Sequence, residues 1–202
     1  MSEEAEHDAR HAERMRRVQA IRRDMMAEKT VERGLLIVHT GAGKGKSTAA
    51  FGLVLRALGH GWPVGVVQFI KGAWDTGERR LLEGSEMVRW HSMGEGFTWE
   101  TQDRDRDVAA AKAAWAKAQA LMADPAIRLV VLDELNIALR YDYLSLADVV
   151  AELTGRRPGL HVVVTGRNAK PELIEAADLV TTFEATKHHF AAGVRAQAGI
   201  EF

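Results

Sequence analysis

Short apolar runs alternate with stretches of helical periodicity between residues 35 and 182. Uninterrupted apolar runs are typical of strands that are buried on both faces of a parallel sheet. The predicted strands cover residues 35–38, 64–70, 88–92, 129–132, 162–164 and 179–182. The predicted helices cover residues 48–58, 78–82, 103–122, 144–153 and 171–177. Strands that alternate with helices predict an α/β fold, with a mostly parallel six-stranded sheet and helices on both faces.

The helix predicted over residues 48–58 has a strongly apolar side. Two glycines, Gly59 and Gly61, follow it and are expected to end it, because glycine readily adopts the conformations that terminate helices. The expected inner face of this helix consists of Ala49, Leu53, Leu55 and Leu58.

The first 33 residues have a different character, with eight acidic and eight basic side chains. Met15, Val18, Ile21 and Met25 recur at helical spacing, which predicts a helix over residues 6–28 with a narrow apolar stripe. The chain is therefore expected to consist of a charged N-terminal arm, residues 1–33, and an α/β domain, residues 34–202. The arm could close over the domain as a lid, remain partly ordered, or form a solvated helix whose stripe packs elsewhere.

The composition narrows the classes of function. A chain of 202 residues, 47% of them apolar, can build one full core and is not disordered throughout. The net charge of −1 argues against a general nucleic-acid binder. The absence of cysteine excludes disulfides and thiolate metal sites, and it is compatible with a reducing cytoplasm. No apolar run approaches membrane-spanning length, so no membrane association is expected.

A glycine-rich loop connects the first predicted strand to the first long helix of the domain. Glycines let backbone amides approach an anion, and the helix N-terminus adds partial positive charge. Lys46 can reach the outer phosphates of a nucleotide, and the Ser47 hydroxyl can bind Mg²⁺. The expected nucleotide-binding residues of this loop are Thr40, Gly41, Ala42, Gly43, Lys44, Gly45, Lys46, Ser47 and Thr48.

The loop departs from the common phosphate-binding pattern G-x-x-x-x-G-K-[ST], because Thr40 stands where the first glycine belongs. The dinucleotide-binding pattern G-x-G-x-x-G also fails, because Lys46 stands at its third glycine. The alternative interpretation is a strand-to-helix turn that binds no ligand. That alternative gives no reason for two lysines and two hydroxyl groups to share one tight loop.

Two carboxylates, Asp133 and Glu134, directly follow the strand predicted over residues 129–132. In many nucleotide-binding proteins a carboxylate at a strand end faces the Mg²⁺ that the loop hydroxyl holds. We therefore expect Ser47, Asp133 and Glu134 to bind Mg²⁺ or Mn²⁺. The pattern leaves open which of the two carboxylates lies nearer to the metal.

Two arginines are further candidates for contact with the nucleotide. Arg167 follows Gly166 at the end of a predicted strand, and ligands bind at the strand carboxyl ends of parallel sheets. Arg56 lies ten residues beyond Lys46, and it is either a surface residue or a contact for an anionic partner.

Phe97 and Trp99 lie in a polar loop bounded by glycine, and they would point to the same side of an extended backbone. Two large aromatic side chains in such a loop are suited to covering a flat ligand. The alternative is that both side chains fold back onto the core.

Taken together, these motifs resemble those of the P-loop ATP:corrinoid adenosyltransferases of the cobalamin pathway. The resemblance covers about residues 30–202. Ala42 and Ser47 stand where that family commonly has asparagine and threonine, so Ser47 keeps the metal-binding hydroxyl and Ala42 loses a side-chain contact. The segments that resemble the family are residues 40–52, Val66-Val-Gln-Phe-Ile-Lys-Gly72, Gly96-Phe-Thr-Trp99, Leu132-Asp-Glu-Leu135 and residues 193–202.

The resemblance implies transfer of the adenosyl group of ATP to cobalt(I) of a corrinoid, with release of triphosphate. Lys46 and a metal ion would stabilise the departing triphosphate. Phe97 and Trp99 would cover the lower face of the corrin and displace its axial ligand. The resemblance further implies a cytoplasmic homodimer that receives cobalt(I) through a flavin-type reductase.

Two other functions remain open on the sequence alone. An ordinary P-loop ATPase or small-molecule kinase would account for the glycine loop and for Asp133 and Glu134, but it would leave Phe97 and Trp99 without a role. A nucleotide-dependent binding module would bind MgATP and leave it intact. The products distinguish the three, because only adenosyl transfer yields triphosphate and a cobalt–carbon bond.

Overall fold

The computed structural model describes residues 3–70, 76–93 and 103–202, and it describes the side chains of the first helix from residue 6 onward. The chain divides into two compact units, Met1–Glu32 and Arg33–Phe202. The first unit contains helix α1 (Glu3–Ala27), close to the residues 6–28 predicted as helical. Its apolar side chains are largely exposed to solvent, with exposed fractions of 42% for Met15 and 56% for Met25.

The second unit is built on a six-stranded sheet with the strand order β3-β2-β4-β5-β1-β6. All of its strand pairs are parallel, which confirms the predicted fold class. β1, β2 and β4 are buried at every position, as their uninterrupted apolar runs predicted. The strands are β1 (Leu36–Thr40), β2 (Val64–Gln68), β3 (Val88–Ser92), β4 (Leu129–Asp133), β5 (His161–Thr165) and β6 (Leu179–Thr182).

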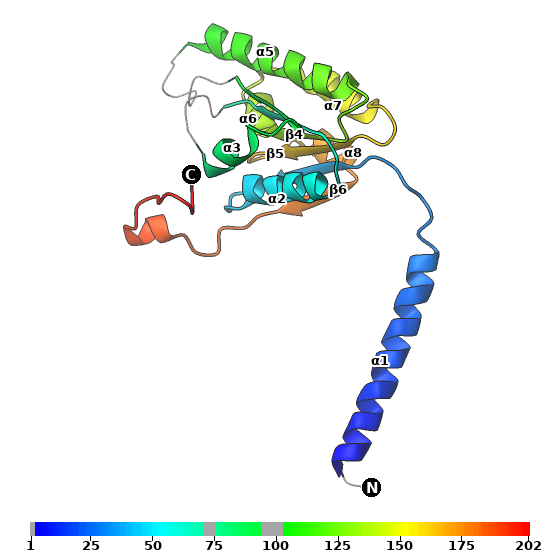
Figure 1. Cartoon of the computed structure of the whole chain (residues 1–202). Helices are drawn as coiled ribbons and strands as arrows, with labels where there is room; N and C mark the ends of the chain where they lie inside the picture. The colour runs from blue at the N-terminus through cyan, green and yellow to red at the C-terminus, as the bar shows by residue number, and fades with distance from the viewer. Residues whose placement is uncertain (1–2, 71–75, 94–102) are drawn as a thin grey trace. The chain divides into compact units, whose positions relative to one another are not determined.

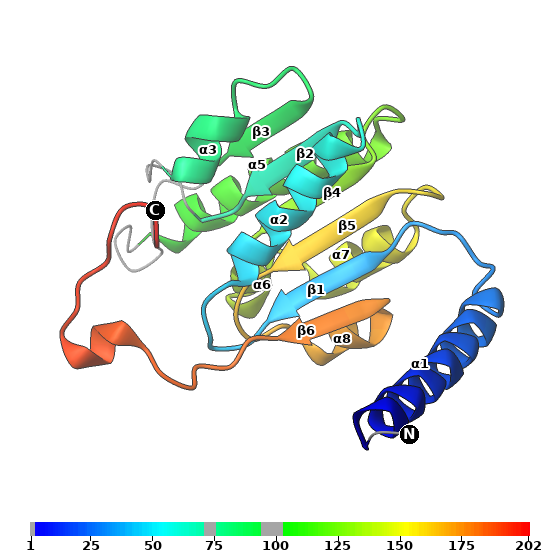
Figure 2. The ribbon, with the colours of Figure 1, turned by 60° about the horizontal axis from the view of Figure 1, so that its bottom comes forward.

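Helices cover both faces of the sheet, as predicted (Figures 1 and 2). One apolar core joins the sheet to α2 and α3, and the other joins its opposite face to α5, α6, α7 and α8. Among the α-helices in the described parts of the chain, α6 alone has no counterpart among the predicted helices. The helices are α2 (Lys46–Gly59), α3 (Gly77–Leu82), α5 (Arg104–Ala123), α6 (Leu135–Arg140), α7 (Leu146–Thr154) and α8 (Pro171–Ala176).

Side chains that cap the helices fix several of these boundaries. The Asp103 carboxylate accepts a hydrogen bond from the Arg106 amide at the start of α5, and the Ser145 hydroxyl accepts one from the Asp148 amide at the start of α7. Such caps satisfy amides that have no partner within the helix. Pro171 begins α8, where the missing N–H of proline costs nothing.

The inner face of α2 differs in part from the predicted one, although Leu53 and Leu58 pack half-buried against the core as predicted. Its buried residues are Lys46, Ala50, Phe51, Val54 and Ala57. Leu55, predicted to face inward, is 53% exposed. The physical reason lies at the start of the helix, where Ser47 points at the sheet and donates a hydrogen bond to Asp133. This contact sets the rotation of the helix, so that positions 50, 51 and 54 follow Ser47 inward at helical spacing.

Because all strands of the sheet are parallel, their carboxyl ends meet at one edge. The register pairs Gln68 of β2 with both Ser92 of β3 and Asp133 of β4 at this edge. The loop after β1 begins at the same edge, and Gly166 and Arg167 follow β5 there. None of the helices in the described parts of the chain is both long and apolar enough to cross a lipid bilayer.

Removing residues 1–28 should leave the Arg33–Phe202 unit folded. Every buried apolar residue in the described part of the chain lies at position 36 or beyond, so none of the described side chains of residues 6–28 belongs to either core. The melting temperature, followed by circular dichroism, should fall by less than about 3 °C, equivalent to roughly 1 kcal/mol. A collapse of thermal stability would show that the apolar stripe of α1 is structural.

Candidate functional site

The glycine loop between β1 and α2 packs closely against the segment that follows β6. The Gly43 amide donates a hydrogen bond to the Phe183 carbonyl at 2.7 Å. A Cβ at Gly43 would lie 2.5 Å from the Glu184 carbonyl oxygen, and one at Gly41 would lie 2.4 Å from that of Phe183. Gly41 also has a φ of 100°, which side chains disfavour. Both positions therefore require glycine.

Thr40, the departure from the common loop pattern, is still part of β1. Its hydroxyl oxygen accepts a hydrogen bond from the Ala169 amide at 3.0 Å, and its carbonyl accepts one from the Phe183 amide at 2.8 Å. The turn of the loop begins only at Gly41. Position 40 consequently does not need the conformational freedom of glycine, and the threonine side chain ties the loop to the segment after β5.

Lys46 is buried in this loop, with 7% of its surface exposed. Its Nζ donates hydrogen bonds to the carbonyl oxygens of Gly41 at 2.9 Å and Gly43 at 2.5 Å. Burial lowers the pKa of Lys46, and the positive charges of Arg167 and Lys44 lower it further, while Glu134 opposes them. The loop thus holds an amine that loses hydration and stands near two other cations, which is a setting suited to an anionic ligand.

Asp133, at the end of β4, is fully buried and accepts hydrogen bonds from three side chains. The hydroxyls of Ser47 and Thr165 each donate to its Oδ1 at 2.7 Å. The Gln68 amide donates to its Oδ2 at 3.1 Å. Because Ser47 gives its proton to Asp133, the lone pairs of its oxygen remain available to a cation.

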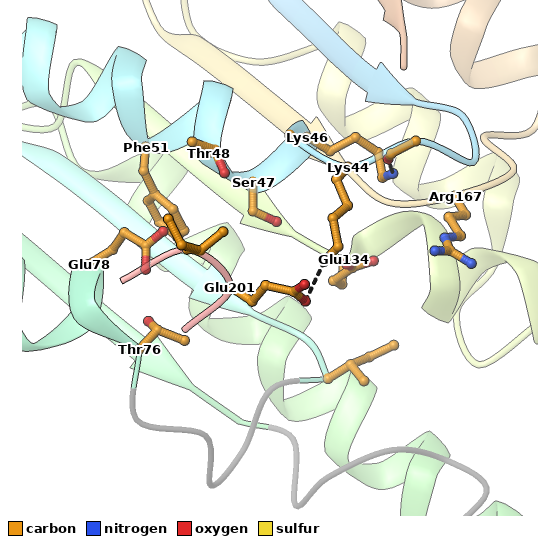
Figure 3. Close-up of a pocket in the computed structure, with 14 residues that line it drawn as sticks. Lys44, Lys46, Ser47, Thr48, Phe51, Thr76, Glu78, Glu134, Arg167 and Glu201 are labelled. Atoms are coloured by element: carbon orange, nitrogen blue, oxygen red, sulfur yellow. Dashed lines mark hydrogen bonds and ion pairs between the residues drawn. The ribbon is translucent and has the colours of Figure 1, made fainter. Parts of the chain in front are cut away.

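A pocket of about 350 Å³ opens beside the loop (Figure 3). Glu134 lines it, whereas Asp133 lies behind Ser47 and does not. Glu134 has a φ of 63°, at the point where β4 gives way to α6, and its amide donates a hydrogen bond to the Thr165 hydroxyl. The lining residues are Gly43, Lys44, Gly45, Lys46, Ser47, Thr48, Phe51, Ile70, Thr76, Glu78, Glu134, Arg167, Ile200 and Glu201.

The C-terminal tail reaches this pocket, which the sequence did not indicate. The Glu201 carboxylate forms an ion pair at 2.6 Å with Lys44 of the loop and lies 2.6 Å from the His189 Nε2. His189 begins the short 3-10 helix η1 (His189–Ala192) of the tail. These contacts lower the pKa of Glu201, chiefly through its hydrogen bond with Lys44. Lys44 and Glu201 are 157 residues apart, so no local pattern could have revealed the pair.

The structure brings most of the predicted site residues together. Gly43 to Thr48, Glu134 and Arg167 line the pocket, whereas Thr40, Gly41 and Ala42 are not among its lining residues. Arg56 lies exposed in the last turn of α2, at the end opposite the loop, and does not line the pocket. Phe97 and Trp99 lie outside the described residues.

The sequence matches known proteins along its whole length. Residues 32–202 match the family model of the ATP:corrinoid adenosyltransferase BtuR/CobO/CobP. The chain is 58% identical to a corrinoid adenosyltransferase of Pseudomonas aeruginosa over 203 residues, with all of both chains covered. It is 47% identical over 195 residues to the corrinoid adenosyltransferase CobA of Salmonella typhimurium, covering 96% of this chain and 99% of the relative.

Replacement of Lys46 by methionine should change how stability depends on pH. Burial holds the folded-state pKa of Lys46 below the 10.5 of the unfolded chain. Between these two values the unfolded state binds more protons, so this lysine makes the free energy of unfolding rise with pH in that window. Lys46→Met should lose this contribution, and the wild type should gain stability relative to the variant as the pH rises toward about 10.

The measurement is the free energy of unfolding from urea denaturation at a series of pH values. Lys112→Met removes an exposed lysine of α5 and serves as the control for loss of a surface charge. A constant difference between wild type and Lys46→Met across the series would contradict the assignment of a depressed pKa.

Proposed function

The chain belongs to the ATP:corrinoid adenosyltransferase family, and we propose that ATP binds in the pocket beside the glycine loop. The protein transfers the adenosyl group of ATP to a corrinoid in cobalamin biosynthesis. The observation that supports this location is the convergence of Lys46, Ser47, Glu134 and Arg167 on one pocket from three strand ends. No comparison favours an ATPase or a kinase.

In the proposed reaction, cobalt(I) of the corrinoid substrate attacks the 5′-carbon of ATP. A cobalt–carbon bond forms, the bond from the 5′-carbon to oxygen breaks, and its electron pair leaves with triphosphate. The cobalt is the nucleophile, so no general base on the protein is needed. The task of the protein is to stabilise the negative charge on the leaving group, and Lys46, Lys44 and Arg167 supply positive charge at the pocket.

Mg²⁺ fits the oxygen donors of this pocket. A hydroxyl with free lone pairs on Ser47 and a carboxylate on Glu134 are the hard ligands that Mg²⁺ prefers, and waters and phosphate oxygens commonly complete its shell. We propose that these two residues hold the metal and that Asp133 orients Ser47 from behind. Bound there, Mg²⁺ or Mn²⁺ would neutralise part of the triphosphate charge.

Several further parts of the proposal depend on family resemblance. Phe97 and Trp99 would cover the lower face of the corrin and displace its axial ligand. Residues 1–33 would act as a lid over the domain of residues 34–202. A flavin-type reductase would supply cobalt(I), and the working form would be a cytoplasmic homodimer.

The direct test is incubation of the protein with MgATP and chemically reduced cobalamin, followed by the visible spectrum of the adenosylated product. Lys46→Met should lower this turnover by about a hundredfold, because one preorganised positive charge on the leaving group contributes about 3 kcal/mol. Lys112→Met is the matched control and should retain activity. Near-normal turnover in folded Lys46→Met would exclude Lys46 from the mechanism.

Phe97→Ala and Trp99→Ala should impair the formation of cobalt(I) more than adenosyl transfer. If the two aromatics displace the axial ligand, the variants should lose most activity when cobalt(II) is the starting state and the reductant is mild. They should lose less when a strong chemical reductant supplies cobalt(I), because the ligand no longer matters. ATP affinity, measured by calorimetry, is the control and should hardly change. Equal losses under both reductants would mean that the aromatics only hold the corrinoid.

A further inference from the structure

A row of buried polar side chains crosses the sheet behind the pocket. Gln68 of β2 lies between Ser92 of β3 and Asp133 of β4, and the strand register pairs it with both. Gln68 is 1% exposed and Asp133 is fully buried. Buried polar groups are costly unless they are hydrogen-bonded, so such a row needs a matched set of donors and acceptors.

The hydrogen bonds in this row can run in only one direction. The Trp90 ring nitrogen Nε1 carries a proton and can only donate, and it donates to the Ser92 hydroxyl oxygen at 3.0 Å. Ser92 therefore turns its own proton to the Gln68 Oε1, 2.9 Å away. This fixes the orientation of the Gln68 amide, whose NH₂ group then faces the Asp133 Oδ2 at 3.1 Å. The opposite orientation would place two acceptors against each other.

Both ends of this row hold helix α2. At one end Asp133 accepts the hydrogen bond of Ser47. At the other end the Trp90 ring stacks on Phe51, with ring centres 5.4 Å apart and an angle of 15° between the planes. Ser47 and Phe51 are four residues apart and so lie on the same side of α2, and both line the pocket (Figure 3). The row therefore contacts α2 at two points, Ser47 and Phe51.

We infer that Gln68 is a positioning residue for the nucleotide site, acting through Asp133 on the Ser47 hydroxyl. Asp133 has two oxygens, and the hydroxyls of Ser47 and Thr165 use one of them. Gln68 holds the other, which stops the carboxylate from rotating and keeps the first oxygen aimed at Ser47. The Ser47 lone pairs then stay directed at the pocket, where the proposed metal-bound triphosphate lies. This inference rests on the proposed binding of MgATP in the pocket.

The role predicts an effect that depends on the metal. Gln68→Met keeps the length of the side chain and removes the amide. Affinity for MgATP should fall about tenfold, because a hydrogen bond to a charged group is lost. Affinity for ATP in the presence of EDTA should change less than about threefold, because the Lys46 amine is held by the carbonyls of Gly41 and Gly43 and not through Asp133. Both affinities are measured by calorimetry on the full chain.

A purely structural role would give a different result. Leu153→Ala removes a fully buried side chain of α7, a helix that contributes no residue to the row, and serves as the control for lost stability. It should lower the melting temperature at least as much as Gln68→Met and leave the two affinities in their wild-type ratio. An unchanged ratio in Gln68→Met, or an equally altered ratio in Leu153→Ala, would overturn the inference.

Ser92→Ala tests the direction of the row. It frees the Gln68 amide, so it should reproduce part of the loss in MgATP affinity and add little when combined with Gln68→Met. Fully additive losses would mean that Ser92 and Gln68 do not act as one unit.

Turnover of the wild-type protein separates this inference from the proposed function. If the wild type bound MgATP but formed no adenosylated corrinoid, the proposed function would be refuted. The metal-dependent binding test of Gln68 would still be valid.

Discussion

The site depends on the hydrogen bonds that the buried carboxylate of Asp133 accepts. This carboxylate joins three chain segments that are far apart in sequence, since Ser47, Gln68 and Thr165 all donate to it. A fully buried carboxylate with too few donors would be very costly, so these three side chains are held where they are by the need to satisfy it. Thr165 also accepts from the Glu134 amide, and the same contact therefore helps to place the carboxylate that lines the pocket.

The orientation of α2 shows how this constraint reaches into the core. Hydrophobicity alone predicted that Leu55 would face inward, yet Leu55 is exposed while Ala50 and Val54 are fully buried. A helix can turn only one side to the sheet, and Ser47 must be on that side to meet Asp133. In this orientation the small Ala50 packs against the sheet, and the larger Leu55 is exposed to solvent. A polar contact at the start of the helix thus decides which apolar residues fill one of the two cores.

Features that depend on residues close together in the sequence could be predicted, whereas features that depend on contacts between distant residues could not. The buried strands were predictable because strands covered on both faces need uninterrupted apolar runs, as in Leu129–Asp133. The loop was predictable because its glycines, lysines and hydroxyls are contiguous. The short helix α6 was missed because Glu134 turns the chain with a φ of 63°, which no periodicity reveals. The Glu201–Lys44 pair was missed because only the tertiary fold brings the tail to the loop.

The charges of the pocket suit a ligand that is both anionic and metal-bound. Lys44, Lys46 and Arg167 line the same pocket as Glu78, Glu134 and Glu201, so three basic side chains are matched by three acidic ones. Lys46 rests on loop carbonyls and Lys44 on Glu201, and an entering polyanion must compete with these contacts. A free triphosphate would gain the cations but meet three carboxylates, whereas in a bound Mg²⁺ complex the Glu134 carboxylate would serve as a metal ligand. Under the proposed function, this balance would favour the metal complex over the bare nucleotide, and the orientation of Ser47 would then affect binding.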